Sequence, residues 1–406
     1  MFGAPEWVGR NVAVLLAIGF IPAMVFSWLY ELTPDELKYV DLRRQGKPCM
    51  RMLLLAFALL PAVPASAQKT DPHLRVVDAL VEARAGKDAP GIAVLVMHAG
   101  KVVHLRGYGY ADVDREIPVD GDTLFDLASV SKQMTALAAA LLIVDGTWTE
   151  DRAVAKILPD FASDGVERAI TVGDLIHHVA ALPDYLGDDA PEFTETTTNA
   201  DVVDWLAEQP LTCAPGERYE YSNSAYLLLA SAVAAAAGAK DLASFLHQRV
   251  WEPLGMRSTS IALPAPGVPR RRMSRGYRGD DGEFEVSESP GLVQGDGSVL
   301  TSLRDLSRYE AALAGQTLLG RRTSMLFRNG RFDNGEPIDD GDGNGYGFGW
   351  LLGTWQGERY ASHSGSWMGT ATYYQRNLDS GVSVVVLANG EDLDTEELAG
   401  KIEAVL

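Results

Sequence analysis

The stretch TLFDLASVSK, residues 123–132, decides how this sequence folds, and it runs directly into the apolar stretch QMTALAAALLIVD, residues 133–145. Ser129 and Lys132 form a Ser-x-x-Lys motif at this expected strand-to-helix transition. Residues three apart share one face of a helix, so the two side chains would be neighbours. The positive end of a helix favours negative charge that develops nearby. An unpaired lysine whose pKa is depressed by burial or by nearby cations could act as a base and activate the serine as a nucleophile.

The motif alone is weak, because a second copy, Ser66-Ala67-Gln68-Lys69, occurs in the same chain. Two further short motifs strengthen it. Tyr-x-Asn occurs once, at 221–223, and His-x-Gly occurs at 98–100 in an expected hairpin turn and again at 363–365. Only the order 129–132, 221–223 and 363–365 combines a helix start, a loop before a helix and the entry to a late strand. Taken singly, Tyr221 could be a core aromatic residue and Lys132 a solvated helix charge.

With these motifs the chain resembles the serine β-lactamase-related family, which contains class C β-lactamases, D-alanyl-D-alanine carboxypeptidases, D-aminopeptidases and esterases. The stretches that carry the resemblance are TLFDLASVSK (123–132), YEYSNSAY (219–226), WEPLGMRSTS (251–260), GDGSVLTSLRDLSRY (295–309) and YGFGW (346–350). It extends over roughly residues 75–390. One departure is that Ala181 stands where the family has a glycine, which puts the local turn in doubt.

The resemblance implies a role for each motif residue. Ser129 would be the nucleophile that forms an acyl-enzyme, Lys132 would activate it, and Tyr221 would move protons to the leaving group. Asn223 would bind the substrate amide or orient Lys132. On the third motif, His363 and Gly365 would contact the substrate, and the backbone N–H of Ser366 would complete an oxyanion hole with that of Ser129. His363 stands where many relatives have lysine.

The pattern of apolar residues predicts an α+β fold, with an antiparallel sheet built from both chain ends, flanked by helices, and a helical lobe of the β-lactamase/transpeptidase kind. We expect strands over 91–97, 101–109, 346–353, 370–376 and 381–388, and helices over 130–145, 171–180, 199–208, 222–237, 302–314 and 394–406. Ser222 is the expected N-cap and Gly238 the C-terminal stop of one helix. Ser302 and Asp305 predict a capping box. Residues 276–291 and 329–349 are expected to be surface loops.

Composition excludes several classes of function. The formal net charge of −20 argues against a nucleic-acid partner and against docking on anionic lipid through charge. The two cysteines, Cys49 and Cys213, cannot form a disulfide framework, and no Cys/His cluster has zinc-ligand spacing. We therefore expect no metal and no cofactor. The oligomeric state is left open.

Two apolar segments precede the expected catalytic domain. The stretch NVAVLLAIGFIPAMVFSWLY, residues 11–30, is uncharged and long enough to span a bilayer. The stretch beginning at Met50 has the pattern of a signal peptide, with cleavage after Ala67. Residues 1–49 are thus a transmembrane or misassigned N-terminal segment, 50–67 a signal peptide or second membrane segment, and 68–406 the β-lactamase-related serine hydrolase domain. Either arrangement places residues 68–406 outside the inner membrane, in the periplasm or another extracytoplasmic space. Where residues 1–49 are retained, 11–30 would anchor the chain in the inner membrane.

These observations predict an exported serine hydrolase acting on small-molecule or peptide substrates through their ester or amide bonds. Histidine is mostly uncharged at neutral pH whereas lysine is charged, so His363 would attract a substrate carboxylate poorly. We therefore expect a poor β-lactamase. The alternatives are a β-lactamase or D-alanyl-D-alanine carboxypeptidase, and a membrane-tethered sensor that is acylated without turnover.

Overall fold

The structure of this chain, a computed structural model, divides into two units, Met1–Lys69 and Thr70–Leu406. It describes residues 72–406 except 87, 160, 162–167, 189, 192–193, 195, 280–281 and 289–292, together with two paired strands of the first unit, β1 (Tyr30–Leu32) and β2 (Leu37–Tyr39). The signal peptide expected at 50–67 and all but the last residue of the membrane segment expected at 11–30 lie outside the described residues.

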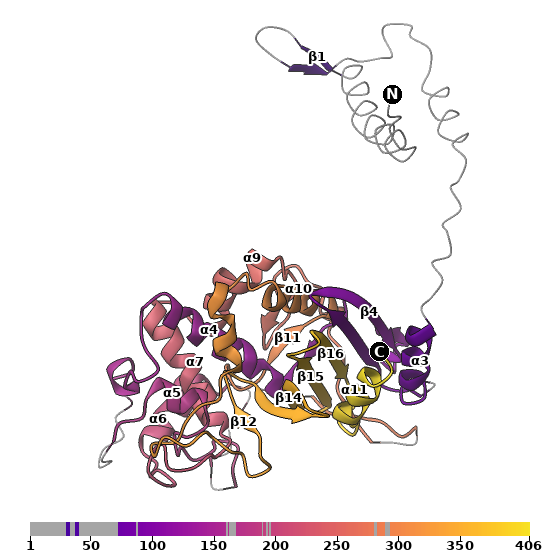
Figure 1. The fold of residues 1–406 in the computed structure, drawn as a ribbon. Coiled ribbons are helices and arrows are strands. Elements are labelled where there is room, and N and C mark those ends of the chain that lie inside the picture. The colour runs from indigo at the N-terminus through magenta and orange to yellow at the C-terminus, as the bar shows by residue number, and fades with distance from the viewer. Residues whose placement is uncertain are drawn as a thin grey trace, which may run out of the picture. The chain divides into compact units, whose positions relative to one another are not determined.

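Seven antiparallel strands form the central sheet of the second unit (Figure 1). Their order across the sheet is β12 (Gly345–Tyr346), β13 (Leu351–Trp355), β14 (Glu358–Trp367), β15 (Thr370–Asn377), β16 (Val382–Ala388), β3 (Ile92–His98) and β4 (Lys101–Tyr108). The join between the two chain ends is the β16–β3 ladder, in which Val384 pairs with Val96. The α+β prediction, with an antiparallel sheet built from both chain ends, is therefore confirmed.

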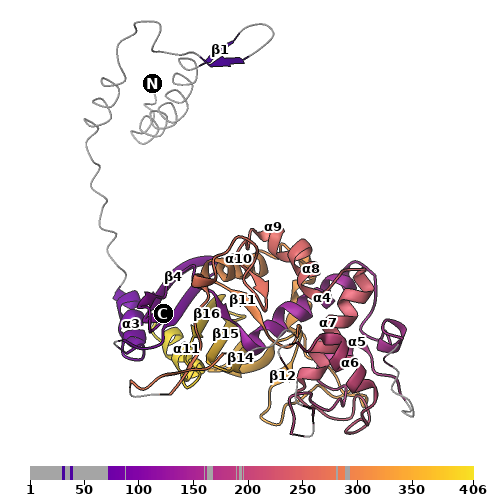
Figure 2. The ribbon, with the colours of Figure 1, turned by 180° about the vertical axis from the view of Figure 1, so that it is seen from behind.

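Side-chain alternation places a different core on each face of this sheet. Along β3, Val94 and Val96 pack with α3 (Pro72–Glu82) and α11 (Thr395–Glu403) on one face. The intervening Ala93 and Leu95 belong to the larger core that the helical lobe covers. Burial on both sides explains why this strand is a continuous apolar run. Figure 2 shows α3 and α11 beside the sheet and the helical lobe away from them.

The helical lobe is built around α4 (Lys132–Val144) and α7 (Asn223–Ala237), which pack against each other. Both are rich in apolar residues. Most of α4 and nine of the fifteen residues of α7 are buried, as expected for helices inside a core. The remaining helices of the unit are α5 (Val172–Ile176), α6 (Asn199–Ala207), α8 (Leu242–Leu246), α9 (Glu252–Leu254) and α10 (Leu303–Ala314). Short helices of other types are η1 (Ala128–Ser131), η2 (Val154–Lys156), η3 (His247–Trp251), η4 (Arg270–Arg272) and η5 (Gly320–Phe327).

Three small sheets complete the unit. A three-stranded sheet joins β7 (Phe125–Asp126), β11 (Val299–Thr301) and β8 (Ser260–Ile261), and holds the chain just before Ser129. The two others are the pairs β5 (Tyr110–Asp112) with β6 (Ile117–Pro118), and β9 (Tyr277–Arg278) with β10 (Glu285–Val286). In the described part of the chain, no single helix is long and apolar enough to cross a membrane, although α7 and the stretch Leu242–Leu254, bent by 63°, reach that length and composition together.

Most predicted elements are present, including the first hairpin, α4, α6, α11 and the last two strands. Ser222 caps α7 by accepting a hydrogen bond from the Ala225 N–H, and Gly238 ends that helix with a left-handed φ of 62°. Helix α3 and strand β14 were not predicted as separate elements. The His-x-Gly motif lies within β14 and not at the entry to a strand, which corrects that expectation.

Four local predictions are wrong for identifiable reasons. The strand expected over 346–353 is interrupted, because Gly349 has a φ of 76° and packs against the backbone of Lys132. The helix expected over 171–180 ends at Ile176, shortly before the left-handed His178. The capping box is incomplete, because the Asp305 carboxylate accepts the Ser258 N–H. The loop expected over 276–291 contains the β9–β10 pair.

Candidate active site

A strained turn presents Ser129. The chain leaves β7 and enters η1 with Ala128 at a φ of 45°, a conformation that L residues rarely adopt. The Asp126 carboxylate stabilises this turn by accepting the Ala128 N–H at 2.8 Å, and burial raises the pKa of Asp126 to about 6. Strain of this kind is frequently found at functional sites, where the surrounding structure holds it in place.

Lys132 lies beneath Ser129, one turn into the helix, and is fully buried. Its ammonium group donates to Ser129 Oγ at 3.0 Å, to Asn223 Oδ1 at 2.8 Å and to the Asp296 carbonyl oxygen at 2.8 Å. Burial lowers the pKa of Lys132 to about 8. A neutral lysine has two N–H groups, which the fixed acceptors Asn223 and Asp296 would use. Its lone pair would then face the Ser129 hydroxyl.

Asn223 has its amide orientation fixed by Asp184. The Asp184 carboxylate accepts the Asn223 backbone N–H at 2.8 Å and its side-chain Nδ2–H at 3.1 Å. A carboxylate can only accept, so the Asn223 amide nitrogen must face Asp184 and its oxygen must face Lys132. Of the two roles expected for Asn223, this geometry favours the orientation of Lys132 over the binding of a substrate amide.

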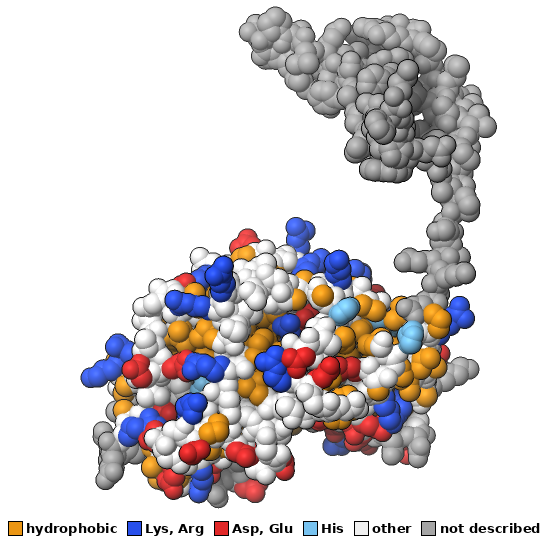
Figure 3. All heavy atoms as spheres, viewed as in Figure 1, with side chains coloured by type: hydrophobic (Ala, Val, Ile, Leu, Met, Phe, Trp, Pro, Cys, Tyr) orange, Lys and Arg blue, Asp and Glu red, His pale blue; other side chains and the backbone are white. Residues whose placement is uncertain are grey.

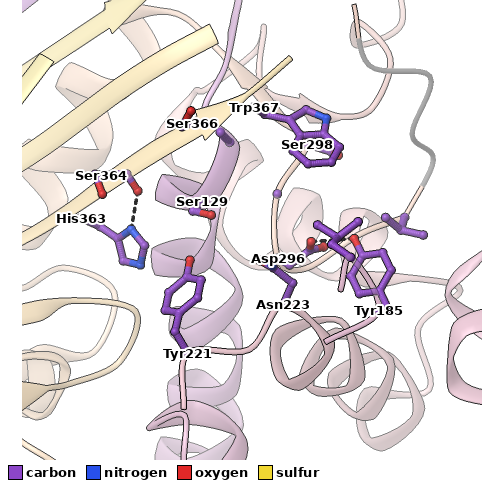
Figure 4. Close-up of a pocket in the computed structure, with 14 residues that line it drawn as sticks. Ser129, Tyr185, Tyr221, Asn223, Asp296, Ser298, His363, Ser364, Ser366 and Trp367 are labelled. Carbon is purple, nitrogen blue, oxygen red and sulfur yellow. Dashed lines mark hydrogen bonds between the residues drawn. The ribbon is translucent and has the colours of Figure 1, made fainter. Parts of the chain in front are cut away.

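Tyr221 lies directly across from the nucleophile (Figure 4). Its hydroxyl points toward Ser129, and its ring centroid lies 4.8 Å from the Lys132 ammonium nitrogen. The residue keeps 40% of its surface exposed at the pocket. Loss of solvent around its hydroxyl raises the pKa of Tyr221 above its usual value. The phenol is therefore protonated at neutral pH and can donate its proton.

His363 lies in β14 and has both ring nitrogens occupied. Its Nε2 lies 2.9 Å from the Tyr346 hydroxyl and its Nδ1 lies 2.6 Å from the Ser364 carbonyl oxygen. Because a carbonyl can only accept, Nδ1 carries the proton and Nε2 accepts from Tyr346. Burial, with the nearby positive charge of Lys132, lowers the pKa of His363 to about 3. The side chain lines the pocket as a neutral ring, with neither nitrogen free to bind a substrate carboxylate.

Gly365 allows β14 to approach the nucleophile turn. A Cβ atom at this position would lie 2.5 Å from the Leu127 carbonyl oxygen and 2.3 Å from Thr372 Oγ1, which is closer than real atoms come. The structure thus explains Gly365 by close packing and not by contact with substrate. The approach brings Ser366, the next residue, into the wall of the same pocket as Ser129. Their two backbone N–H groups are the expected oxyanion donors.

The pocket that these residues share has a volume of about 380 Å³. Its apolar wall is formed by Tyr185, Leu186, Val293 and Trp367. Asp296 lies beside Tyr185. Its carboxylate accepts from the Tyr185 hydroxyl at 2.7 Å, and its other oxygen has no hydrogen-bond partner among the described residues. Within the described residues, no group of three or more His, Cys, Asp or Glu side chains is arranged to hold a metal ion.

Five of the seven predicted site residues line this pocket: Ser129, Tyr221, Asn223, His363 and Ser366. Lys132 is buried beneath Ser129, and Gly365 packs against the nucleophile turn. The structure also adds residues that the sequence analysis gave no role. Asp184 lies within HVAALPDY (178–185), and Asp296 lies within GDGSVLTSLRDLSRY (295–309). The feature that could have indicated them in the sequence is an acidic residue within a stretch that resembles the family. The buried ring of His178 and the hydroxyl of Tyr346 were also missed. Their contacts span from 17 to 44 positions of sequence, and no local pattern reports them.

Comparison with known proteins identifies a family and several relatives. The family model described as Beta-lactamase matches residues 77–405. The chain is 32% identical over 321 residues to Penicillin-binding protein 4* of Bacillus subtilis, covering 75% of this chain and 68% of that one. It is also 32% identical over 190 residues to Esterase EstB of Burkholderia gladioli, covering 43% and 48%. Some curated relatives match over most of this chain. The chain spans about two thirds of the length of these relatives.

A solved structure shows the same fold. The crystal structure of D-amino acid amidase from Ochrobactrum anthropi SV3 superposes with a TM-score of 0.67 at 22% identity, over 82% of this chain and 98% of that chain. At this identity the likeness concerns the fold alone.

Proposed function

This chain belongs to the beta-lactamase family and is a serine hydrolase, and we propose that it hydrolyses uncharged ester or amide substrates through an acyl-enzyme on Ser129. In the first step, neutral Lys132 takes the Ser129 proton while Ser129 Oγ attacks the substrate carbonyl carbon. The oxyanion that forms accepts from the backbone N–H groups of Ser129 and Ser366. Removing one such donor from an oxyanion hole typically costs about 3 kcal/mol of transition-state stabilisation.

The pKa shifts support the following assignment of the proton transfers. Lys132, with a pKa of about 8, is partly neutral near neutral pH and can act as base. Tyr221, with its raised pKa, stays protonated and donates to the leaving alcohol or amine, while Lys132 can replace its proton. In the second step, water attacks the acyl-Ser129 carbonyl carbon while Lys132, neutral again after passing its proton to Tyr221, accepts the water proton. The bond to Ser129 Oγ breaks, and Lys132 returns this proton to the released Ser129 oxygen.

The observation that carries the substrate preference is the state of His363. A positively charged lysine at this place would attract the carboxylate of a β-lactam or of a peptide C-terminus. Here a neutral ring stands instead, with both nitrogens hydrogen-bonded. Lys132, the cation beneath Ser129, is already held by three acceptors. The names of the relatives, which include an esterase and an amidase, are compatible with such substrates.

The test is a comparison of kcat/KM for a p-nitrophenyl ester, a D-amino-acid p-nitroanilide and a cephalosporin, with Ser129→Ala as the control. The proposal expects Ser129-dependent turnover of the ester or the anilide and slow turnover of the cephalosporin. Cephalosporin turnover above about 10⁵ M⁻¹s⁻¹ would place the enzyme in the range of efficient catalysts and would contradict it.

We also propose that the catalytic unit is exported, with the stretch at 11–30 as a membrane contact or with cleavage after Ala67. The support is the sequence pattern of the two apolar segments. N-terminal sequencing of the chain from a fractionated bacterial host tests it. The expected product starts at Gln68 outside the cytoplasm, or remains uncleaved in the membrane fraction, whereas an intact chain in the cytoplasmic fraction would contradict export.

A further inference from the structure

His178 lies in the helical lobe just behind the site, and the reaction steps above do not use it. It is completely buried and has a left-handed φ of 57°. Four tyrosine rings enclose its imidazole, with ring centroids at 4.4 Å (Tyr221), 4.5 Å (Tyr346), 4.9 Å (Tyr226) and 5.9 Å (Tyr219). A polar ring in such surroundings requires a reason, because burial of polar atoms is costly unless they are hydrogen-bonded.

The reason is found in the segment that carries Tyr221. The backbone N–H of Ser222, which lies between Tyr221 and Asn223, donates to His178 Nδ1 at 3.1 Å. Two residues earlier, the Glu220 N–H donates to the His178 carbonyl oxygen at 2.8 Å. One residue therefore holds the Tyr-x-Asn segment by two hydrogen bonds. Because Nδ1 accepts, the imidazole proton is on Nε2, which has no hydrogen-bond partner among the described residues.

The same imidazole also supports the opposite wall of the site. Its ring packs edge-on to Tyr346, whose hydroxyl donates to His363 Nε2 at 2.9 Å. It also packs against Tyr221, whose hydroxyl points toward Ser129 (Figure 4). His178 thus contacts the Tyr-x-Asn motif directly and the His-x-Gly motif through Tyr346. Among the described residues it has no hydrogen bond to Ser129 or Lys132.

The left-handed backbone strengthens this interpretation. A non-glycine residue that is buried in this conformation is strained, and strain of this kind is retained where the structure fixes a side chain for a purpose. Glycine would adopt the conformation without strain but would leave the Ser222 N–H without an acceptor. Asparagine tolerates it well and could place an oxygen close to the position of Nδ1.

We propose that His178 is a positioning residue for acyl transfer, which fixes the Tyr221 hydroxyl on Ser129 by accepting the Ser222 N–H. The proposal rests on the proposed function, since it assigns a role in the same site. It predicts that loss of the acceptor lowers kcat and leaves KM nearly unchanged, because the substrate pocket keeps its walls while the proton-transfer geometry is lost. Misplacement of a catalytic group by about 1 Å can cost on the order of 100-fold in rate.

The experiment compares His178→Asn with His178→Gly in the full chain. Both substitutions tolerate the left-handed backbone and both remove the ring, so they differ mainly in the acceptor for the Ser222 N–H. We expect the kcat of the Asn variant to exceed that of the Gly variant by about tenfold or more, with KM values within about threefold of each other. Thermal melting of both variants measures stability separately. Equal kcat values in the two variants would overturn the proposal.

His104→Asn is the matched control. His104 is also a buried histidine, but it lies on β4 and its Nε2 is hydrogen-bonded to the Tyr108 hydroxyl at 2.9 Å. Its substitution is expected to lower the melting temperature and to leave kcat unchanged. If the wild-type chain shows no Ser129-dependent turnover, the proposed function and this role are both overturned. If the wild type turns over at Ser129 and the Asn and Gly variants are equal, this role alone is overturned.

Discussion

Lys132 determines at which pH the site can react, because its pKa of about 8 lies close to physiological pH. Only the neutral amine can take the Ser129 proton, so kcat/KM for a neutral ester is expected to rise about tenfold per pH unit below 8 and to level off above it. Stopped-flow or steady-state kinetics between pH 6 and 9.5 measure this. Lys132→Arg, which stays charged throughout, is expected to be inactive over the whole range. A flat profile in the wild type would show that Lys132 is not the base.

His363 controls which substrates are attracted, and this leads to a second prediction. His363→Lys places a positive charge on the pocket wall, and such a charge about 4 Å from a carboxylate is worth roughly 1–4 kcal/mol. We expect kcat/KM for a penicillin to rise by about tenfold or more relative to that for a neutral ester. His363→Gln, which is neutral and polar, is the matched control and should leave the ratio near its wild-type value. An equal change in both variants would contradict the assignment.

The sequence predicts which residues form the site better than it predicts what each of these residues does. Ser129, Lys132, Tyr221 and Asn223 converge on one pocket as expected. The orientation of Asn223 depends on Asp184, which lies 39 positions away, and the neutrality of His363 depends on its burial. Such roles follow from contacts that form only when the chain is folded, and no local spacing encodes them.

At the scale of elements, β14 brings the third motif to the nucleophile turn, and Gly365 makes this approach possible. Gly365→Ala would drive a Cβ into the Leu127 carbonyl, so β14 or the turn must move. We expect kcat to fall at least about 100-fold, since such a displacement misplaces the oxyanion donors. Kinetics and thermal melting of the variant measure both effects.

Gly400 provides the matched control for that substitution. It lies in the interior of α11, and a Cβ there would meet open space. Gly400→Ala is expected to leave kcat unchanged and to raise the free energy of unfolding by about 1 kcal/mol, because alanine favours a helix. If Gly365→Ala behaved like Gly400→Ala, close packing of β14 on the nucleophile turn would not matter for activity.

Helices and strands with a clear pattern of apolar residues could be predicted from the sequence, and short helices and strands could not. The β3–β4 hairpin and the buried helices α4 and α7 follow directly from apolar runs bounded by turn residues. The break at Gly349 depends on contact with Lys132, which is distant in sequence. Ala181 has a left-handed φ of 57°. The local turn therefore forms here although alanine stands where the family has a glycine.

At the scale of the whole molecule, the unit Thr70–Leu406 contains both hydrophobic cores and every residue of the site. Figure 3 shows acidic and basic side chains spread over the viewed face of this unit, as expected for a surface that faces water. A chain reduced to residues 70–406 is therefore expected to fold and to keep kcat/KM within about twofold of the full chain. Circular dichroism and ester kinetics measure this, and loss of folding would show that the first unit contributes to stability.

The central claim is that Ser129 forms an acyl-enzyme that water then releases. The most direct test is intact-mass spectrometry of the chain mixed with a p-nitrophenyl ester, with Ser129→Ala as the control. The account predicts a transient adduct of the mass of the acyl group, dependent on Ser129 and accompanied by release of p-nitrophenol in every turnover. A lasting adduct without turnover would instead favour an acylated sensor, and ester hydrolysis that persists in Ser129→Ala would contradict the account.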